Sequence, residues 1–420
     1  PSRSVFVADV PADARLFFAA GIAPEHHSDP GVEFRVKVAR GGREEVVWTR
    51  VLNPIAERED RRWVPAEVDL SAHTGRGVEI VFETSGYEET GNPTQAVWGA
   101  PTLATPRGDD APLVVVFLVD SLRADHTTSY GYERDTTPEL MEFTRDGVVY
   151  DAAIASAGWT KPSVASIFTS QVPSRHGVMQ IADRLGEDHV TLAEMLKARG
   201  YSTGALIGNA AVHSQGSGYE QGFDVFTGVP GPHGRRSKVV DAADVVDAAL
   251  GFIDARRGLP TFVYVHTMDP HIPYVPPEPF DRMFEPPPAP GRSAADPRKD
   301  YESPEDLARV IAQYDGSIAY GDREFGRFLD ELRARGLYDR AFIAFVADHG
   351  EEFLDHGRWT HAKSVFDELV RVPLVVKHPG QEDAGKRVST QVQLVDLLPT
   401  ILENEGLPVP TAPAIAGRPL

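Results

Sequence analysis

One threonine occupies a position that suits a catalytic nucleophile. Thr160 precedes Pro162 within residues 158–163, and proline fits a first helical turn because its missing N–H group is not needed there. The residues that follow can continue a helix, so Thr160 lies where the helix begins. Free N–H groups and the positive end of the helix dipole favour an anion at that point, so the hydroxyl is suited to attack a phosphate or sulfate ester. The alternative is that Thr160 only caps the helix.

Two buried strands are predicted to carry metal ligands to the same region. Residues 113–119 and 341–347 are unbroken apolar runs, typical of strands in a sheet that is covered on both faces. Asp120 follows the first run, and Asp348 and His349 follow the second. Ligands of open α/β sheets bind outside the carboxyl ends of the strands, so we expect these residues to converge with the threonine on one divalent cation. The alternative for each aspartate alone is a turn residue or a helix cap.

The residue types in this set indicate which metal would bind. An imidazole beside carboxylates and a hydroxyl favours Zn or Mn, with Mg or Ca as the remaining candidates, because Ca prefers a shell of oxygen atoms. The cation would lower the pKa of the Thr160 hydroxyl and neutralise the ester. His271, in Asp269-Pro270-His271, is a candidate to contact an ester oxygen or to protonate the leaving group. The alternative is a loop histidine with an ordinary structural hydrogen bond.

Six segments of the chain follow one another in the order seen in sulfatases. They are Asp120-Ser121-Leu122-Arg123-Ala124-Asp125, Trp159-Thr160-Lys161-Pro162-Ser163, Pro173-Ser174-Arg175-His176-Gly177, His266-Thr267-Met268-Asp269-Pro270-His271-Ile272-Pro273-Tyr274, Asp348-His349-Gly350-Glu351 and Arg371-Val372-Pro373-Leu374. Through this ordered set, which is far more specific than any single motif, residues 113–420 resemble a sulfatase-type member of the alkaline phosphatase superfamily. The resemblance implies a doubly wound, mostly parallel α/β sheet and an ester hydrolase.

Two positions depart from the sulfatase pattern. Sulfatases of this type usually carry Cys or Ser, oxidised to formylglycine, at the position of Thr160, and threonine cannot become that aldehyde. They also tend to have Asn at the position of His349 and to bind Ca. Both differences favour the relatives with a threonine nucleophile, which include phosphodiesterases and phosphotransferases. The family match also places a lysine and a nearby histidine on the ester oxygens, which implies such roles for Lys363 and His361. Their alternative is a solvated surface patch.

Six further residues are weaker candidates for a role in the site. Three of them have no assigned role, namely Arg123, Asn209 and His356. The other three would be needed for a second metal, namely Asp269, Asp315 and Asp322. No metal-ligand spacing among these aspartates supports a second site.

Length and composition limit the possible domain organisation and partners of the chain. At 420 residues the chain is long enough for two domains with large cores. The formal charge of −20 argues against nucleic acid as a partner, yet allows an anionic substrate because dispersed surface charge is screened within about 10 Å. The absence of cysteine excludes disulfides and thiolate sites, and no apolar run is long enough for a transmembrane helix. The chain begins with Pro1 and not Met, so a signal or anchor could have been removed or never included. Sulfatases continue beyond Leu420, so we expect a fragment. The location is not fixed by these features, with a periplasmic or extracellular one favoured.

Residues 1–106 are predicted to form a separate β-sandwich. Residues 32–38 alternate apolar and polar side chains, residues 78–84 do so less strictly, and residues 15–19 and 44–51 are further strand candidates. This part is similar to jelly-roll, galactose-binding accessory domains, in which an exposed aromatic ring stacks on a sugar. Three tryptophans are candidates for that contact or, alternatively, for the core: Trp48, Trp63 and Trp98.

Residues 112–420 are the predicted catalytic domain, and residues 102–112 the boundary. Strands and helices alternate in this part, as in a doubly wound fold. We expect helices over residues 138–146, 191–199, 238–257, 305–335 and 393–403, strands over 201–207, 261–266 and 373–377, and a proline-rich loop over 270–297.

Three functions are consistent with these features. The first is a sulfatase-like, metal-dependent hydrolase that cleaves a small-molecule, glycan or lipid-linked sulfate or phosphate ester through Thr160. The second is a phosphotransferase or phosphodiesterase acting on a glycan or lipid head group. The third is an inactive carbohydrate-binding homologue. The intact set of Asp120, Thr160, Asp348 and His349 argues against the third, because drift would be expected to break a ligand set that no longer served.

Overall fold

A computed structural model describes residues 2–23, 26–28, 31–61, 64–86, 96–214, 216–229, 240–284, 304–411 and 414–420 of the chain. The chain divides into two compact units. The first comprises Pro1–Ala111 with Gly251–Pro260, and the second comprises Pro112–Leu250 with Thr261–Leu420. The division after Ala111 falls within residues 102–112, where the sequence changes from isolated strands to alternating strands and helices.

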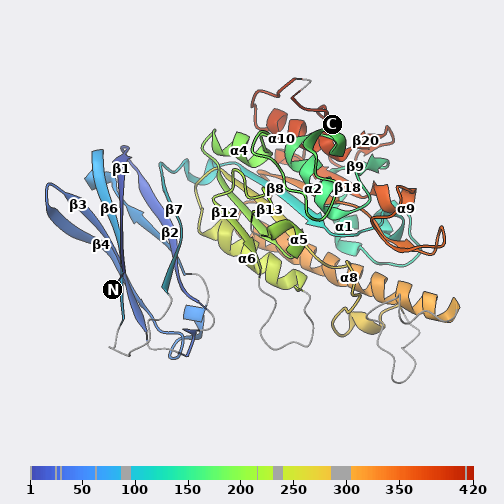
Figure 1. Cartoon of the computed structure of the whole chain (residues 1–420), viewed down its shortest axis with the longest axis horizontal. Coiled ribbons are helices and arrows are strands. Elements are labelled where there is room, and N and C mark those ends of the chain that lie inside the picture. Colours follow the sequence, from blue (N-terminus) through green and yellow to red (C-terminus); the bar gives the residue numbers. More distant parts are fainter. Residues whose placement is uncertain are drawn as a thin grey trace. The chain divides into compact units, whose positions relative to one another are not determined.

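Seven strands in the described part of the first unit form two antiparallel sheets (Figure 1). The four-stranded sheet has the order β1 (Ser2–Val10), β6 (Gly75–Gly86), β3 (Val32–Arg40) and β4 (Arg43–Leu52). The three-stranded sheet has the order β5 (Val64–Asp69), β2 (Arg15–Ile22) and β7 (Ala96–Ala104). All four strands predicted from residue alternation are therefore present, and each is longer than predicted.

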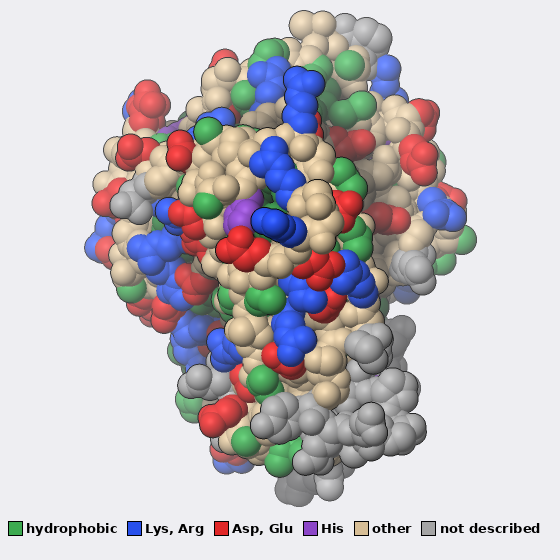
Figure 2. All heavy atoms as spheres, turned by 90° about the vertical axis from the view of Figure 1, so that its left-hand side faces the viewer, with side chains coloured by type: hydrophobic (Ala, Val, Ile, Leu, Met, Phe, Trp, Pro, Cys, Tyr) green, Lys and Arg blue, Asp and Glu red, His purple; other side chains and the backbone are tan. Residues whose placement is uncertain are grey.

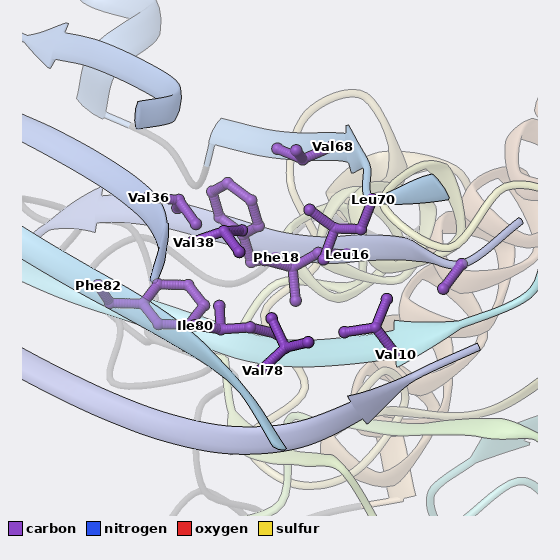
Figure 3. Packing of buried hydrophobic residues seen from close by; sticks show 11 residues of the cluster. Val10, Leu16, Phe18, Val36, Val38, Val68, Leu70, Val78, Ile80 and Phe82 are labelled. Carbon is purple, nitrogen blue, oxygen red and sulfur yellow. The ribbon is translucent and has the colours of Figure 1, made fainter. Parts of the chain in front are cut away.

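Side chains from both sheets of this unit meet in an apolar core. Alternation along β3 turns Val36 and Val38 inward, where they lie beside Ile80 of the neighbouring β6 and pack with Phe18 of β2 in the other sheet (Figure 3). Two tryptophans join this core: Trp48 lies 5.0 Å from Phe18 between ring centroids, and Trp98 lies 5.0 Å from Phe34. Sugar stacking by these two rings is therefore wrong, because both pack against core residues. Trp63 lies outside the described residues.

Charged side chains of the four-stranded sheet pair across its strands. Arg3 contacts Glu44 and Glu83 at 2.6 Å each, and Lys37 contacts Glu83 at 2.6 Å and Glu44 at 3.2 Å. Exposed pairs of this kind contribute little stability, about 0–1 kcal/mol each. Figure 2 likewise shows acidic and basic side chains interspersed on the face that it draws. On that face acidic and basic side chains are mixed, as on an ordinary solvent-exposed surface, and do not form a binding patch of a single charge sign.

The second unit is built on an eight-stranded mixed sheet. Its order is β12 (Val225–Gly228), β11 (Ser202–Ile207), β13 (Thr261–Thr267), β8 (Leu113–Val119), β14 (Ala341–Ala347), β18 (Leu374–Lys377), β9 (Val148–Tyr150) and β19 (Arg387–Val388). The strands from β12 to β14 are parallel, and β18 is antiparallel to both of its neighbours. The predicted strands at 113–119, 201–207, 261–266, 341–347 and 373–377 are confirmed. The two apolar runs, β8 and β14, are central neighbours.

Helices cover both faces of this sheet (Figure 1). Phe117 of β8 packs on Phe325 and Phe328 of α8 (Pro304–Ala334), with ring centroids 4.9 and 5.5 Å away. Val265 is the register partner of Phe117, so the adjacent Tyr264 points to the opposite face. There Tyr264 packs on Phe168 of α2 (Thr160–Thr169), at 4.8 Å. The doubly wound arrangement predicted from the sequence is therefore present.

The remaining elements of the second unit are short. The other helices are α1 (Pro138–Phe143), α3 (Pro173–His176), α4 (Leu192–Lys197), α5 (Ala210–His213), α6 (Ala242–Asp254), α9 (Asp367–Val370) and α10 (Leu397–Asn404). A three-stranded sheet contains β17 (Arg371–Val372), β10 (Ala153–Ile154) and β20 (Val392–Gln393), and a hairpin contains β15 (Glu352–Phe353) and β16 (Trp359–Thr360). Every helix predicted from the sequence has a counterpart, although residues 238–239 and 285–297, within the predicted α6 and proline-rich loop, lie outside the described residues.

Across the described residues, no helix combines the length and the apolar character needed to cross a membrane.

Candidate active site

Four adjacent parallel strands end with polar side chains at one edge of the sheet. Asn209 follows β11, His266 lies near the end of β13, Asp120 follows β8, and Asp348 follows β14. The registers of β13 and β14 on β8 are in step, since His266 and Val346 both pair with Leu118. Because the carboxyl ends of these strands coincide, residues up to 228 positions apart in the sequence meet at one place.

The nucleophile candidate is the first residue of α2 and does not cap it. Trp159 is the N-cap, with extended φ and ψ of −168° and 162° and no capping bond from its side chain. The Thr160 hydroxyl instead lies 3.2 Å from Nε2 of His349. The capping alternative is therefore wrong, while Pro162 stands in the first turn as predicted.

The start of α2 is held on one side by the end of β14 and on the other by the segment that follows β16. The hydroxyl of Ser163 donates to the main-chain oxygen of Asp348 at 2.7 Å. Gly158, just before the helix, allows close approach, because a Cβ atom there would lie 2.7 Å from the oxygen of Ser364. The N–H of Ala362 also donates to the oxygen of Gly158 at 2.9 Å. The position of Thr160 is thus fixed by backbone contacts on both sides.

His349 presents a lone pair to the centre of this cluster. Its Nδ1 lies 2.8 Å from the carbonyl oxygen of Gly350, which can only accept, so Nδ1 carries the proton and Nε2 is unprotonated. Burial, with a contribution from the charge of His361, lowers the pKa of His349 to about 3. Nε2 lies 3.5 Å from Oδ1 of Asp120 and 3.5 Å from Oδ2 of Asp348. The neutral ring is suited to bind a cation together with these carboxylates.

The carboxylates of Asp120 and Asp348 are fully buried, and their negative charges repel each other. Burial and the nearby Asp120 charge raise the pKa of Asp348 well above its usual range. Burial alone would also raise the pKa of Asp120, but His271 and His266 lower it below the usual value. Within the described part of the chain, Oδ2 of Asp348 has no hydrogen-bond partner. A divalent cation would supply the missing positive charge, so the donor set fits one.

His266 is the site residue that the sequence analysis did not single out. Its Nε2 lies 3.0 Å from Oδ2 of Asp120, and its side chain is fully buried. Potential ligand atoms of Asp120, His266 and Asp348 all lie within 4.8 Å of one another. The available signal was its place at the end of the buried strand 261–267, the same feature that identified Asp120.

Two further histidines lie beside the cluster. The ring of His361 is 4.5 Å from that of His349 and 5.1 Å from that of His271, between centroids. Burial alone would lower the pKa of His361, but the charge and hydrogen bond of Glu351, 3.0 Å away, raise it overall. Thr360 and Ala362 flank His361 with φ of 66° and 73°, a conformation uncommon outside glycine. His361 thus lies next to His349, whose Nε2 contacts the Thr160 hydroxyl, and His271 lies next to His361.

Lys363 lies at the edge of the site rather than in its centre. Its side chain is exposed, and its charge reaches His361, whose pKa it lowers slightly. The described contacts include none from its ammonium to Thr160 or to the carboxylates. The ammonium nearest the nucleophile in sequence, that of Lys161, donates instead to the oxygens of Ile181 and Asp183 at 2.7 and 2.5 Å.

The weaker candidates fall into two groups. Asn209 contacts Asp120 directly, with its Nδ2 atom 2.6 Å from Oδ2. Arg123 is buried in ion pairs with Asp125 and Asp355, and the exposed His356 stacks on Phe366. These two therefore support the surrounding loops.

The aspartates considered for a second metal belong to no potential ligand cluster among the described residues. Asp322 accepts from the N–H groups of Glu139 and Leu140 at the start of α1. Asp315 accepts from three side chains, those of His126, Tyr132 and Arg134. Asp269 accepts from the N–H of Ala242 at the start of α6. Each carboxylate serves a separate structural contact, so they form no common ligand set.

Comparison with known proteins identifies the family. A family model described as Sulfatase matches residues 112–406. The chain belongs to the sulfatase family. A ulvan-active sulfatase of Formosa agariphila is 24% identical to it over 326 residues, which cover 71% of this chain and 62% of that protein. This chain therefore spans less than two thirds of the length of that relative.

Solved structures share the fold of the second unit. A phosphonate monoester hydrolase from Silicibacter pomeroyi superposes with a TM-score of 0.59 at 24% identity, covering 74% of this chain and 76% of that one. The soluble domain of lipooligosaccharide phosphoethanolamine transferase A from Neisseria meningitidis gives a TM-score of 0.56 at 18% identity, covering 70% and 87%. The fold is thus the alkaline phosphatase-like α/β fold with a large mixed sheet. The sulfatase relatives support the predicted class, an ester hydrolase.

Proposed function

We propose that this chain is a metal-dependent hydrolase of sulfate or phosphate esters with Thr160 as its nucleophile. The observation that carries the proposal is the 3.2 Å separation between the Thr160 hydroxyl and Nε2 of His349, at the start of a buried helix. A hydroxyl in that position adjoins two buried carboxylates and the N-terminal end of α2, which favours an anionic ester. Family membership supports the same reaction class.

The proposed metal ligands are Asp120, Thr160, Asp348 and His349. The neutral Nε2 of His349 and the unpaired Oδ2 of Asp348 support this set, and a nitrogen among oxygens favours Zn or Mn over Ca. When bound, a divalent cation lowers the pKa of a hydroxyl and offsets the negative charge of the ester. The rest of the reaction falls to side chains of this chain.

The first half of the reaction forms a covalent adduct. The Thr160 oxygen bonds to phosphorus or sulfur and gives up its proton to solvent, while the ester's alcohol oxygen leaves with the bonding electron pair. We assign His271 to protonate that departing oxygen. In the second half, water activated by His361 attacks the same phosphorus or sulfur, and the Thr160 oxygen leaves. The hydrogen bond that Nδ1 of His361 donates to Glu351 orients the His361 ring for this step.

The side chain at the nucleophile position favours phosphate over sulfate esters. A formylglycine hydrate releases sulfate by elimination, whereas a secondary alcohol has no second hydroxyl for that route. The threonine adduct must be cleaved by attack at sulfur or phosphorus. The start of α2, and a cation if held by the proposed ligands, would stabilise the additional charge of a phosphoryl adduct. We therefore expect phosphate esters to be turned over at least as well as sulfate esters.

A second candidate function is phosphoryl-group transfer to an acceptor alcohol on a glycan or lipid. It differs from hydrolysis only in the group that removes the adduct from Thr160. The threonine at position 160, which cannot become formylglycine, favours this transfer. The phosphoethanolamine transferase with the same fold provides a precedent for that chemistry. The third candidate, an inactive carbohydrate-binding homologue, is disfavoured because Trp48 and Trp98 are core residues and the proposed ligand set is intact.

We also propose that residues 1–106 form an accessory β-sandwich domain that precedes, along the chain, the catalytic domain of residues 112–420. The two antiparallel sheets and their common core support this division.

A kinetic panel tests the proposed function. Aryl sulfate, aryl phosphate monoester, diester and phosphonate substrates with one common leaving group would be compared at several divalent ions, with and without an added acceptor alcohol. We expect phosphate or phosphonate turnover to equal or exceed sulfate turnover. Turnover of sulfate alone would contradict the threonine mechanism, and a product formed only with the acceptor would favour the transferase.

A further inference from the structure

Asp120 presents its two carboxylate oxygens to two different sets of groups. Oδ2 lies 2.6 Å from Nδ2 of Asn209 and 3.0 Å from Nε2 of His266. Oδ1 lies 3.1 Å from the Ser121 hydroxyl and 3.5 Å from Nε2 of His349. Only Oδ1 therefore faces the nucleophile side of the site.

The amide of Asn209 has a fixed orientation. Its Oδ1 accepts from the N–H of Ala211 at 2.8 Å and so caps α5. The opposite end, Nδ2, must then face Asp120 and donate to it. A second cation next to Oδ2 of Asp120 would meet this N–H group at close range, which is electrostatically unfavourable. The cap on a neighbouring helix thus determines what Oδ2 can bind.

His266 allows two protonation patterns. Its Nδ1 lies 2.9 Å from the hydroxyl of Tyr264, and both side chains are fully buried. Burial raises the pKa of Tyr264 well above its usual value, so the hydroxyl keeps its proton and can donate to Nδ1. Nε2–H then donates to Oδ2 of Asp120. In the other pattern Nδ1–H donates to Tyr264, and Nε2 is a ligand of a second cation held with Asp120 and Asp348.

We propose that Asn209 and His266 form a two-donor clamp on Oδ2 of Asp120, so that the site takes one ion through Oδ1. The fixed amide selects the first pattern, because both donors can then serve the same oxygen without a competing cation. In this arrangement His266 and Asn209 are positioning residues that orient the Asp120 carboxylate. The inference rests on the metal site of the proposed function, and it adds the two residues that orient the Asp120 ligand.

Metal titration of the full chain tests the clamp without any ester substrate. Chelator-stripped protein would be titrated with Zn or Mn by calorimetry, and bound metal per chain counted by elemental analysis. The parent should bind one ion. His266→Gln keeps an N–H donor within reach of Asp120 and should retain near-parental metal affinity. His266→Leu should lower the metal affinity about 10- to 100-fold, which is the usual effect of removing a residue that orients a metal ligand. His356→Gln, at an exposed histidine, is the control.

The outcomes separate the clamp from the proposed function. Two ions in the parent and one in both His266 variants would overturn the clamp, while leaving metal-dependent chemistry in place. A parent that binds no divalent ion would overturn the clamp and the metal site together, and the kinetic panel would then decide the activity. Equal affinity losses for His266→Gln and His266→Leu, with one ion in the parent, would also overturn the clamp by making His266 a ligand. Thermal melts of the stripped proteins identify variants that fail to fold.

Discussion

The hydroxyl of Ser163 donates to the main-chain oxygen of Asp348 at 2.7 Å, and so ties the first turn of α2 to the end of β14. Both residues are fully buried. This bond fixes the helix of the proposed nucleophile relative to the strand that carries two of the proposed metal ligands.

Loss of this bond is expected to affect activity as well as stability. Ser163→Ala leaves a buried carbonyl without its donor, which costs about 1–3 kcal/mol of unfolding free energy. It also releases Thr160 relative to His349, so kcat should fall about 10-fold or more. Ser166→Ala is the matched control, since Ser166 lies in the same helix and contacts His176 at 3.0 Å instead. Equal kcat values for the two variants would show that the bond has no role in positioning.

Thr160 is expected to carry the covalent adduct. Trapping with a slow phosphoryl substrate, followed by intact-mass measurement and peptide mapping, should place one phosphoryl group on Thr160. Thr160→Ser should retain part of the turnover because it keeps a hydroxyl at the start of α2, and Thr160→Ala should abolish it. Near-parental turnover by Thr160→Ala, or an adduct on another residue, would favour direct attack by water.

Removal of either ligand from the end of β14 is expected to remove the metal. Asp348→Ala and His349→Ala should each lose bound metal in elemental analysis, while Asp330→Ala, an exposed aspartate on α8, should keep it. Chelation should lower the melting temperature of the parent, because an ion present at 100 times its Kd stabilises the folded state by about 2.7 kcal/mol. Retention of metal by both ligand variants would refute the assignment.

His176 is expected to make the protein less stable in acid. Burial, with a smaller contribution from His189, lowers its pKa from 6.5 to about 4. The unfolded chain therefore binds more protons than the folded chain between these values, so stability present above pH 6.5 is lost as the pH falls toward 4. Urea unfolding from pH 4 to 7 should show a smaller decline for His176→Asn than for the parent. His356→Asn serves as the control, and identical pH slopes in all three proteins would contradict this origin.

The boundary between the two units is expected to be accessible to proteases. Limited trypsin digestion should cut near Arg107, within residues 102–112, and release a fragment that contains the strands of residues 1–106. A single protected core that spans both parts would count against two independent domains, although not against the strands themselves.

The sequence predicted the parts of the site that depend on local pattern. The apolar runs of β8 and β14 marked Asp120, Asp348 and His349, and the proline in a first turn marked Thr160. His266 was not singled out because its importance depends on β13 being the neighbour of β8, and strand order is a tertiary property. Nothing in the residues from 261 to 267 states which strand they will pair with.

Loop and surface residues were harder to predict. Lys363 follows Thr360 and Ala362, which both adopt positive φ although neither is a glycine, so the loop turns in a way that its composition does not signal. The position of Trp48 and Trp98 depends on which face of each strand is covered by the opposite sheet. That choice is set by packing in three dimensions, and alternation along one strand leaves it open.

The order of the strands in the sheet also has a consequence for synthesis. β8 lies between β13 and β14, which are made about 140 and 220 residues after it. While the chain emerges from the ribosome, the nucleophile's helix is complete long before His349 exists, so no ion can be held there. The proposed catalytic centre is therefore one of the last features of this unit to assemble, and a nascent chain released early would contain Thr160 without Asp348 and His349.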